Sequence, residues 1–177
     1  MRRNDASHAA LSEARELGHE ARAEGADHAV LKLWLRLLSC TTQIETLVRK
    51  RLRERFGISL ARFDYLAQLH RHADGLTMRV LSRHLMVTGG NVTGLTQELE
   101  RDGLVQRIAS AQDRRVCTLR LTPQGRRSFE AMAREHEAWL LALFDGLDSR
   151  SIGQLHSLLG ELRVQLVGNQ AAEGLPP

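Results

Sequence analysis

The sequence of 177 residues contains two cysteines, three prolines, seven aromatic side chains and no long apolar run. Cys40 and Cys117 are too far apart for a CxxC motif, and two cysteines make no disulfide framework, which favours a reducing, cytoplasmic setting. No segment approaches the ~18 consecutive apolar residues of a transmembrane helix. The first 28 residues include two early arginines but no apolar stretch, so they do not resemble a signal peptide.

Charge is unevenly distributed along the chain. Residues 49–127 contain 16 Lys and Arg against 7 Asp and Glu, whereas the remaining residues contain 9 against 14. A basic middle between acidic flanks indicates a polyanionic partner, although chance clustering on a solvated surface is the alternative. The aromatic residues lie only at 34–65 and 129–144, so the basic stretch 66–128 has no side chain on which single-stranded bases stack. We therefore expect double-stranded DNA as the partner.

Apolar residues at helical spacing predict a mainly α-helical chain. We expect helices at 29–55, 60–72, 78–85, about 89–102, 123–144 and 148–167, with a turn at 73–75 and Gly103 closing the fourth helix. Two strand-like runs follow that helix, at 104–110 and 115–121. Residues 1–28 are interpreted as a mobile arm and residues 168–177 as a disordered tail.

The order helix, short helix, turn, second helix and β-hairpin predicts a winged helix-turn-helix at residues 58–122. In the second helix of the motif, Val92, Leu95 and Leu99 are spaced to pack inward, so its polar side chains face outward. Such side chains can bind base edges or phosphates, and a helix N-terminus can donate backbone N–H groups to a phosphate. The predicted DNA contacts of the two helices are Thr77, Arg79, Thr88, Gly89, Gly90, Asn91, Thr93, Gly94 and Gln97.

The three glycines of this stretch have two interpretations. Glycines let the start of a helix lie close to a DNA duplex, with no side chain in the way. Alternatively, Gly89 and Gly90 form only a tight turn between the two helices. The tip of the hairpin carries Asp113, Arg114 and Arg115, and an arginine on a thin β-loop can enter a narrow, electronegative minor groove. We therefore predict DNA contacts at all three tip residues.

A family resemblance supports this interpretation. The segment DGLTMRVLSRHLMVTGGNVTGLTQELERDGLVQRIASAQDRRVCTLRLTPQG resembles the MarR family of bacterial regulators, and with the flanking helices the resemblance covers about residues 29–167. It implies a homodimer built from residues 29–57 and 123–167, with a recognition helix in the major groove and a wing in the minor groove. By this resemblance, the side chains that contact bases in the major groove are Asn91, Thr93 and Gln97. Arg115 is the arginine of the wing, and Asp113 orients its guanidinium.

One position departs from the family pattern. Many members of the family carry a basic residue where this chain has Gly94. The departure argues against a direct base contact at Gly94 and shifts the expected base contacts to the neighbouring side chains.

Three further segments, RFDYLAQLHR, LSRHLMVTGGNVTGLT and MAREHEAWLLALFDGL, are similar to the branch of the family that controls hydroxycinnamate and related aromatic-acid catabolism. That similarity implies release from DNA by an aromatic acyl-CoA such as p-coumaroyl-CoA or feruloyl-CoA. Trp and His suit a flat ligand with a polar tip, and arginine suits CoA phosphates, although each such residue can equally be plain core. The predicted pocket residues are Trp34, Arg36, Leu37, Leu38, Arg62, Phe63, Leu66, His70, His136 and Trp139.

Other classes of function find little support in the sequence. It has no phosphate loop, nucleophile elbow or paired carboxylates, so we predict that it is not an enzyme and needs no cofactor. No HExxH motif or tight His/Cys cluster indicates a metal site. Cys40 and Cys117 are interpreted as buried small hydrophobes, not as redox sensors. A response to a free aromatic acid or to oxidation, an architectural DNA binder without a ligand, and activation in place of repression remain open.

Overall fold

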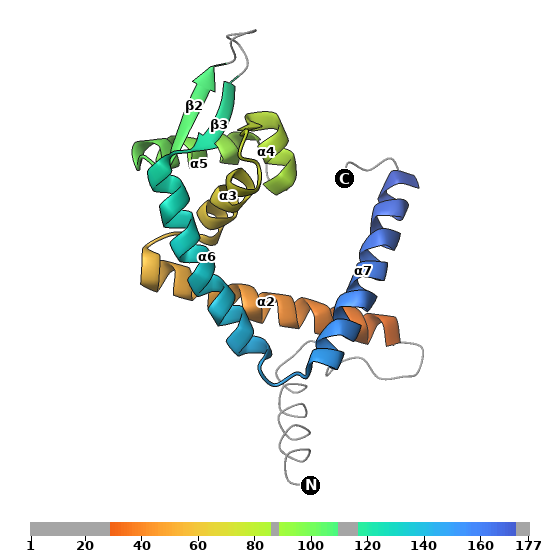
Figure 1. Cartoon of the computed structure of the whole chain (residues 1–177). Coiled ribbons are helices and arrows are strands. Elements are labelled where there is room, and N and C mark those ends of the chain that lie inside the picture. Colours follow the sequence, from red (N-terminus) through yellow and green to blue (C-terminus); the bar gives the residue numbers. More distant parts are fainter. Residues whose placement is uncertain (1–28, 86–88, 110–116, 173–177) are drawn as a thin grey trace. The chain divides into compact units, whose positions relative to one another are not determined.

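The computed structural model describes residues 29–85, 89–109 and 117–172. Its elements in chain order are α2 (Ala29–Phe56), α3 (Leu60–Arg71), β1 (Leu76–Thr77), α4 (Met78–Leu85), α5 (Gly89–Arg101), β2 (Val105–Ala109), β3 (Cys117–Leu121), α6 (Pro123–Phe144) and α7 (Ser149–Ala172) (Figure 1). The predicted mainly helical chain with a small β-hairpin is therefore confirmed. One compact unit ends at Ala133 and a second begins at Arg134, within α6. Within the described ranges, no helix has the length and apolarity to cross a membrane.

The strands form an antiparallel sheet in the order β1–β3–β2. Strands β2 and β3 pair from Val105 opposite Leu121 to Ala109 opposite Cys117, which confirms the hairpin. Strand β1 joins the far side of β3 after a turn at Gly75, whose φ of 85° is one that glycine adopts without strain. The sequence does not predict β1, because two residues are too few to show an alternating pattern.

The core of the first unit is formed by leucines from its helices and from the central strand β3. Each of these side chains is at most 1% exposed, and burying one stabilises the fold by about 1.5–3 kcal/mol. They are Leu52 of α2, Leu66 and Leu69 of α3, Leu81 of α4, Leu99 of α5 and Leu119 of β3. The helix-turn-helix and the hairpin therefore share one apolar core with α3.

Helix α2 is buried only near its C-terminal end. Val48 and Leu52 are its buried residues. Leu33 and Trp34, which share an apolar stripe with them at helical spacing, are 54% and 56% exposed. Cys40 is exposed and Cys117 is half-buried, so the prediction that both cysteines are buried is wrong. The reason at Cys40 is that the apolar stripe of α2 is longer than the part of it that the core covers.

Helix α7, in the second unit, is capped at its start and longer than predicted. The Asp148 carboxylate accepts a hydrogen bond of 2.7 Å from the Ser151 backbone N–H, which lowers the pKa of Asp148. Residues 168–172, predicted as part of the disordered tail, are the last residues of α7, so that part of the prediction is wrong. Gly168 does not end the helix, because an interior glycine costs only about 1 kcal/mol relative to alanine.

Candidate nucleic-acid interface

Helices α4 and α5 form the predicted helix-turn-helix. The Thr77 hydroxyl accepts a hydrogen bond of 3.4 Å from the Val80 backbone N–H and so caps α4. Arg79, in the first turn of α4, is exposed. Helix α5 begins at Gly89 and has no acidic residue in its first turn. The positive end of the α5 dipole therefore has no carboxylate of that turn beside it, which suits an external anion.

Helix α5 has one buried and one exposed face. Val92, Thr96 and Leu99 are 0% exposed and pack inward. The other face carries small polar side chains and a glycine, namely Asn91, Thr93, Gly94 and Gln97, all of which are exposed. The predicted outward orientation of this face is confirmed, whereas its contact with DNA stays a prediction.

A buried hydrogen-bond chain holds α5 against α3. Tyr65 of α3 and Thr96 of α5 are both 0% exposed, and their hydroxyl oxygens lie 2.6 Å apart. The Thr96 hydroxyl donates to the Val92 carbonyl oxygen at 2.7 Å, so the Tyr65 hydroxyl is the donor to Thr96. Burial raises the pKa of Tyr65 to about 12, so this phenol stays protonated and able to donate even in moderately alkaline solution. The chain fixes the rotation of α5 and hence which of its side chains face outward.

This buried chain predicts a non-additive double-mutant cycle. Thr96→Val leaves the Tyr65 hydroxyl buried without its acceptor, which should lower the free energy of unfolding by about 1–3 kcal/mol. Tyr65→Phe leaves Thr96 bonded to Val92 and should cost only about 0.5–1.5 kcal/mol. The double variant should cost less than the sum, because neither hydroxyl then lacks a partner. Urea unfolding followed by circular dichroism measures all three, and strict additivity would contradict the assignment.

The glycines of α5 do not form the turn between the helices. Gly89 and Gly90 are the first two residues of α5, and the positive φ angles in the described ranges belong to Gly57, Gly75 and Gly103. The alternative interpretation of Gly89 and Gly90 as a tight turn is therefore wrong. A Cβ atom added at Gly90 or Gly94 would meet nothing within 4 Å. No packing within the described chain requires glycine at these two exposed positions, and close approach of DNA to them stays a prediction.

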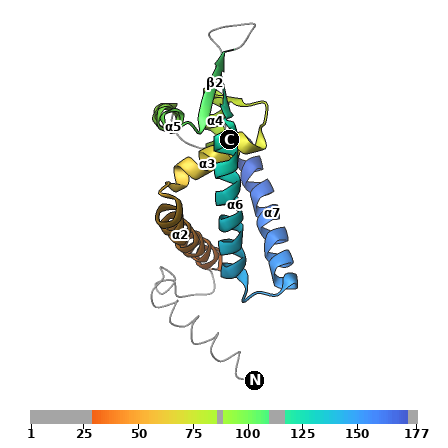
Figure 2. The same ribbon diagram turned by 60° about the vertical axis from the view of Figure 1, so that its left-hand side comes forward.

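The hairpin is tied to the C-terminal part of α5. Arg107 Nε of β2 lies 2.9 Å from both carboxylate oxygens of Glu100 on α5. Figure 2 shows β2 beside α5, which is seen there nearly along its axis. Because a charge-assisted contact is stronger than a neutral hydrogen bond, this pair orients the hairpin on α5. The tip residues Asp113, Arg114 and Arg115 lie outside the described residues, as does Thr88, so their predicted contacts stay predictions.

The structure places the predicted pocket residues in several different environments. Phe63 and Leu66 belong to the buried core. His70 Nε2 lies 3.5 Å from Glu130 Oε1, and its ring lies against Phe129 with centroids 4.8 Å apart. Of the remaining residues, Trp34, Arg36 and Leu38 are exposed, and Leu37, Arg62, His136 and Trp139 are half-buried. Arg62 is the one predicted residue that lines the pocket found in the first unit, and the ligand contacts of the others stay predictions.

Metal binding finds no support in the part of the chain that the structure describes. There, no group of three or more His, Cys, Asp or Glu side chains is placed to hold an ion.

Two contacts of this region involve Thr96 and Asp102, for which the sequence predicts no role. Thr96 lies four residues after Val92 and three before Leu99, so helical spacing alone places it on the buried face. Arg62 Nη2 of α3 pairs with Asp102, which follows α5. These two residues are 40 positions apart, and no local pattern indicates that they meet.

Comparisons with known proteins agree with this geometry. The sequence model of the MarR family matches residues 56–116. An uncharacterized HTH-type transcriptional regulator of Bacillus cereus is 33% identical over 113 residues, which are 64% of this chain and 74% of the relative. The transcriptional activatory protein BadR of Rhodopseudomonas palustris is 33% identical over 104 residues, covering 58% and 59% of the two chains.

A solved structure extends the similarity beyond the matched segment. The crystal structure of Streptococcus pneumoniae FabT in complex with DNA is 30% identical, covers 78% of this chain and 98% of FabT, and superposes with a TM-score of 0.68. Both of these relatives are named as regulators of transcription. The crystal structure of a MarR family transcriptional regulator from Silicibacter pomeroyi is 30% identical, covers 81% of this chain and 99% of that regulator, and superposes with a TM-score of 0.68. The chain therefore belongs to the MarR family of transcriptional regulators.

Proposed function

We propose that the protein is a ligand-responsive transcriptional repressor that binds duplex DNA with α5 in the major groove. The exposed face of α5 carries the proposal: it presents Asn91, Thr93 and Gln97, whose side chains can hydrogen-bond base edges. Gly90 and Gly94 keep the backbone of this face accessible to a phosphate. The DNA complex of FabT supports the assignment, because the fold of FabT is similar to that of this chain.

We further propose that the protein acts as a homodimer through residues 29–57 and 123–167. Exposed apolar side chains support this proposal in each unit separately. In the first unit Val30 and Trp34 of α2 are 80% and 56% exposed, and in the second Leu158 and Leu166 of α7 are 63% and 53% exposed. Several large apolar side chains exposed on one helix favour an interaction site. A two-fold dimer would present its recognition helices to successive major grooves, roughly 34 Å apart.

The proposed effector is an aromatic acyl-CoA of the p-coumaroyl-CoA or feruloyl-CoA type, as the similarity to the hydroxycinnamate branch implies. The dimer would exist in two states. In one of them, the distance between the two recognition helices matches successive major grooves of DNA. A ligand shifts that equilibrium only by its difference in affinity for the two states. A free aromatic acid or an oxidant as the signal, and an architectural role without a signal, are the alternatives. BadR, an activatory protein by name, makes activation a second candidate.

Substitution of the wing arginine tests the proposed minor-groove contact. Arg115→Ala should weaken operator binding by about 1–3 kcal/mol, roughly the value of one specific groove contact. Fluorescence anisotropy with labelled duplex measures this change. Arg71→Ala, which removes an exposed arginine at the end of α3 outside the predicted DNA contacts and the proposed dimer segments, is the matched control and should change the affinity little. An Arg115→Ala variant with the affinity of the parent protein would show that Arg115 is not the wing contact.

Binding to the DNA upstream of the protein's own gene tests the proposal as a whole. A labelled duplex from this region should bind far more tightly than a shuffled duplex of equal length and composition. Its affinity should fall steeply with salt, because arginines that neutralise phosphates release counterions. Equal affinity for both duplexes would favour the architectural alternative over a sequence-specific regulator.

A further inference from the structure

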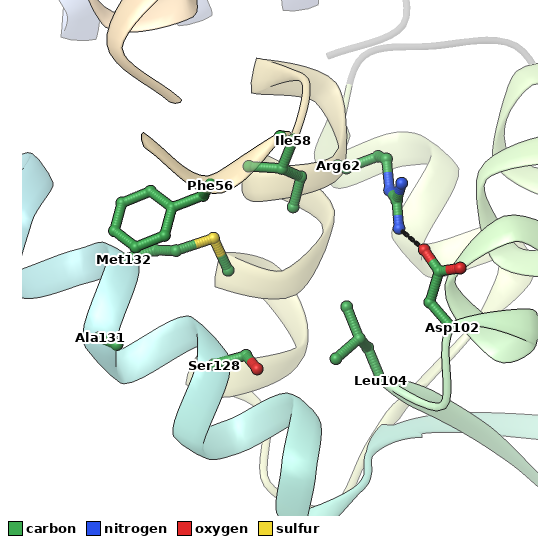
Figure 3. Close-up of a pocket in the computed structure, with 9 residues that line it drawn as sticks. Phe56, Ile58, Arg62, Asp102, Leu104, Ser128, Ala131 and Met132 are labelled. Carbon is green, nitrogen blue, oxygen red and sulfur yellow. Dashed lines mark hydrogen bonds and ion pairs between the residues drawn. The ribbon is translucent and has the colours of Figure 1, made fainter. Parts of the chain in front are cut away.

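Two ion pairs of the first unit hold α5 to its neighbours. Arg62 of α3 pairs with Asp102, the residue that follows α5, as Figure 3 shows. Arg107 of β2 pairs with Glu100 in the last turn of α5. Both pairs fix the C-terminal end of this helix, and neither of them involves α4. The contacts that place the hairpin relative to α4 are therefore separate from these pairs.

A third arginine, Arg120 of β3, joins the hairpin to the turn before β1 and α4. Its Nε donates a hydrogen bond of 2.8 Å to the backbone carbonyl oxygen of Asp74. Arg120 lies opposite Gln106 in the hairpin register, so its side chain is on the other face from that of Arg107. The root of the hairpin is thus held on both faces, by Glu100 on one and by Asp74 on the other.

The turn that accepts from Arg120 is closely packed against β3. Gly75 of this turn has a φ of 85°, and its N–H donates to the His72 carbonyl oxygen at 2.8 Å. A Cβ atom at Gly75 would overlap the side chains of Thr118 and Arg120. These two residues are two positions apart on β3 and therefore lie on one face of it. The turn and this face of β3 thus form one packed unit, in which no side chain fits at position 75.

This packed turn leads directly into α4. Leu76 and Thr77 form β1, where they pair with Leu119 and Thr118 of β3. The Thr77 hydroxyl then caps α4 by accepting from the Val80 N–H. A displacement of β3 is therefore passed on to the start of α4, where two of the predicted DNA contacts lie.

We propose that Arg120 is a positioning residue for DNA recognition, which holds the wing at a fixed angle to α4 so that the wing and the two helices meet one duplex together. The proposal rests on the proposed function, because it concerns how the parts of that interface act jointly. A two-stranded hairpin is only marginally stable by itself. Without the contact to Asp74 the wing would have to be ordered on binding, and that ordering lowers DNA affinity.

A double-mutant cycle with the wing arginine tests this role. Arg120→Met removes the Nε donor but keeps the aliphatic part of the side chain, which packs on Gly75. We expect it to weaken binding of the upstream DNA roughly tenfold, the effect of one hydrogen bond from a charged group. In an Arg115→Ala background, where the wing contact is already lost, the same substitution should cost less than about twofold. Fluorescence anisotropy measures all four proteins, after urea unfolding has shown that each is folded.

Arg120→Lys and the salt dependence separate positioning from a direct phosphate contact. Lysine keeps the positive charge but has no N–H at the position of Nε. We expect Arg120→Lys to lose as much affinity as Arg120→Met, and the slope of log Kd against log salt to stay that of the parent protein. A slope smaller by about 1 in Arg120→Met, with parent-like affinity of Arg120→Lys, would show a phosphate contact and overturn the proposal. An equal loss from Arg120→Met with and without Arg115 would also overturn it, because a merely structural effect is additive.

Hydrogen–deuterium exchange without DNA gives a readout that does not depend on the proposed function. In Arg120→Met we expect faster exchange of the hairpin amides, at residues 105–109 and 117–121, while the amides of α3 exchange as in the parent protein. Unchanged exchange of the hairpin would overturn the positioning role whether or not DNA binds. Faster exchange in a protein that does not bind the upstream DNA would instead contradict the proposed function and leave the contact itself established.

Discussion

Gly94→Glu is expected to abolish operator binding while the protein remains folded. Gly94 lies on the exposed face of α5, and a Cβ atom there would meet nothing within 4 Å. The fold therefore tolerates the side chain, but the carboxylate would face the phosphates of the duplex. Like charges opposed across an interface cost several kcal/mol, so we expect the affinity to fall by about 100-fold or more. Anisotropy titration of upstream DNA measures the loss.

Gly94→Gln is the control for this substitution, because it has nearly the same size and no charge. It should weaken binding less than Gly94→Glu, and the difference between the two isolates the electrostatic repulsion. Gly94→Ala should raise the free energy of unfolding by about 0.5–1 kcal/mol, as expected for an open helix position. Parent-like DNA affinity of a folded Gly94→Glu variant would mean that this face of α5 does not meet DNA.

Gly125→Ala is expected to produce a large loss of stability. Gly125 is a buried residue in the first turn of α6, and a Cβ atom there would overlap the carbonyl oxygen of Leu104. The obstacle is backbone, which cannot turn aside as a flexible side chain can. Leu104 is held from both sides, since its N–H donates to Leu99 and its carbonyl accepts from Thr122. We expect the free energy of unfolding to fall by about 1–3 kcal/mol or more, the cost of overpacking.

Thermal and urea unfolding of the variant measure this effect, with Gly94→Ala as the matched glycine-to-alanine control in an open helix. The free energy of unfolding should fall in Gly125→Ala and rise in Gly94→Ala. This difference separates the effect of close packing from that of helix propensity. The link between α5 and β2 must shift to admit the new methyl group at position 125. DNA affinity should therefore also decrease. A Gly125→Ala variant as stable as the parent protein would contradict the close contact between α6 and Leu104.

The sequence predicts the helices and the orientation of α5 because these depend on local periodicity. Val92 and Leu99 are spaced to pack inward, and both are fully buried. Gln97 faces outward for the same reason. The spacing also reaches Thr96, but its hydroxyl finds a partner only because Tyr65, from another helix, is buried opposite it. Local patterns thus identify the exposed face of α5, but they do not identify the Tyr65–Thr96 hydrogen bond that holds the helix in place.

Features that depend on distant parts of the chain are not predicted. Strand β1 exists because Leu76 pairs with Leu119, 43 positions away. Gly125 is required by the backbone of Leu104, a contact that no periodic pattern contains. The exposed cysteine at position 40 has the same origin, because the apolar stripe of α2 shows which face is apolar and not how far the core extends. Tertiary contacts decide each of these cases.

Release of DNA by an effector is the most direct test of the central claim. The measurement is fluorescence anisotropy on the DNA upstream of the protein's own gene, titrated with p-coumaroyl-CoA, feruloyl-CoA, benzoyl-CoA, the corresponding free acids and free CoA. The account predicts tight binding that one of the aromatic thioesters or acids reverses, while free CoA does not. Tight binding that none of these compounds reverses would contradict the ligand-responsive part of the account. Absence of sequence-specific binding to this DNA would contradict the proposal that the protein is a regulator of these genes.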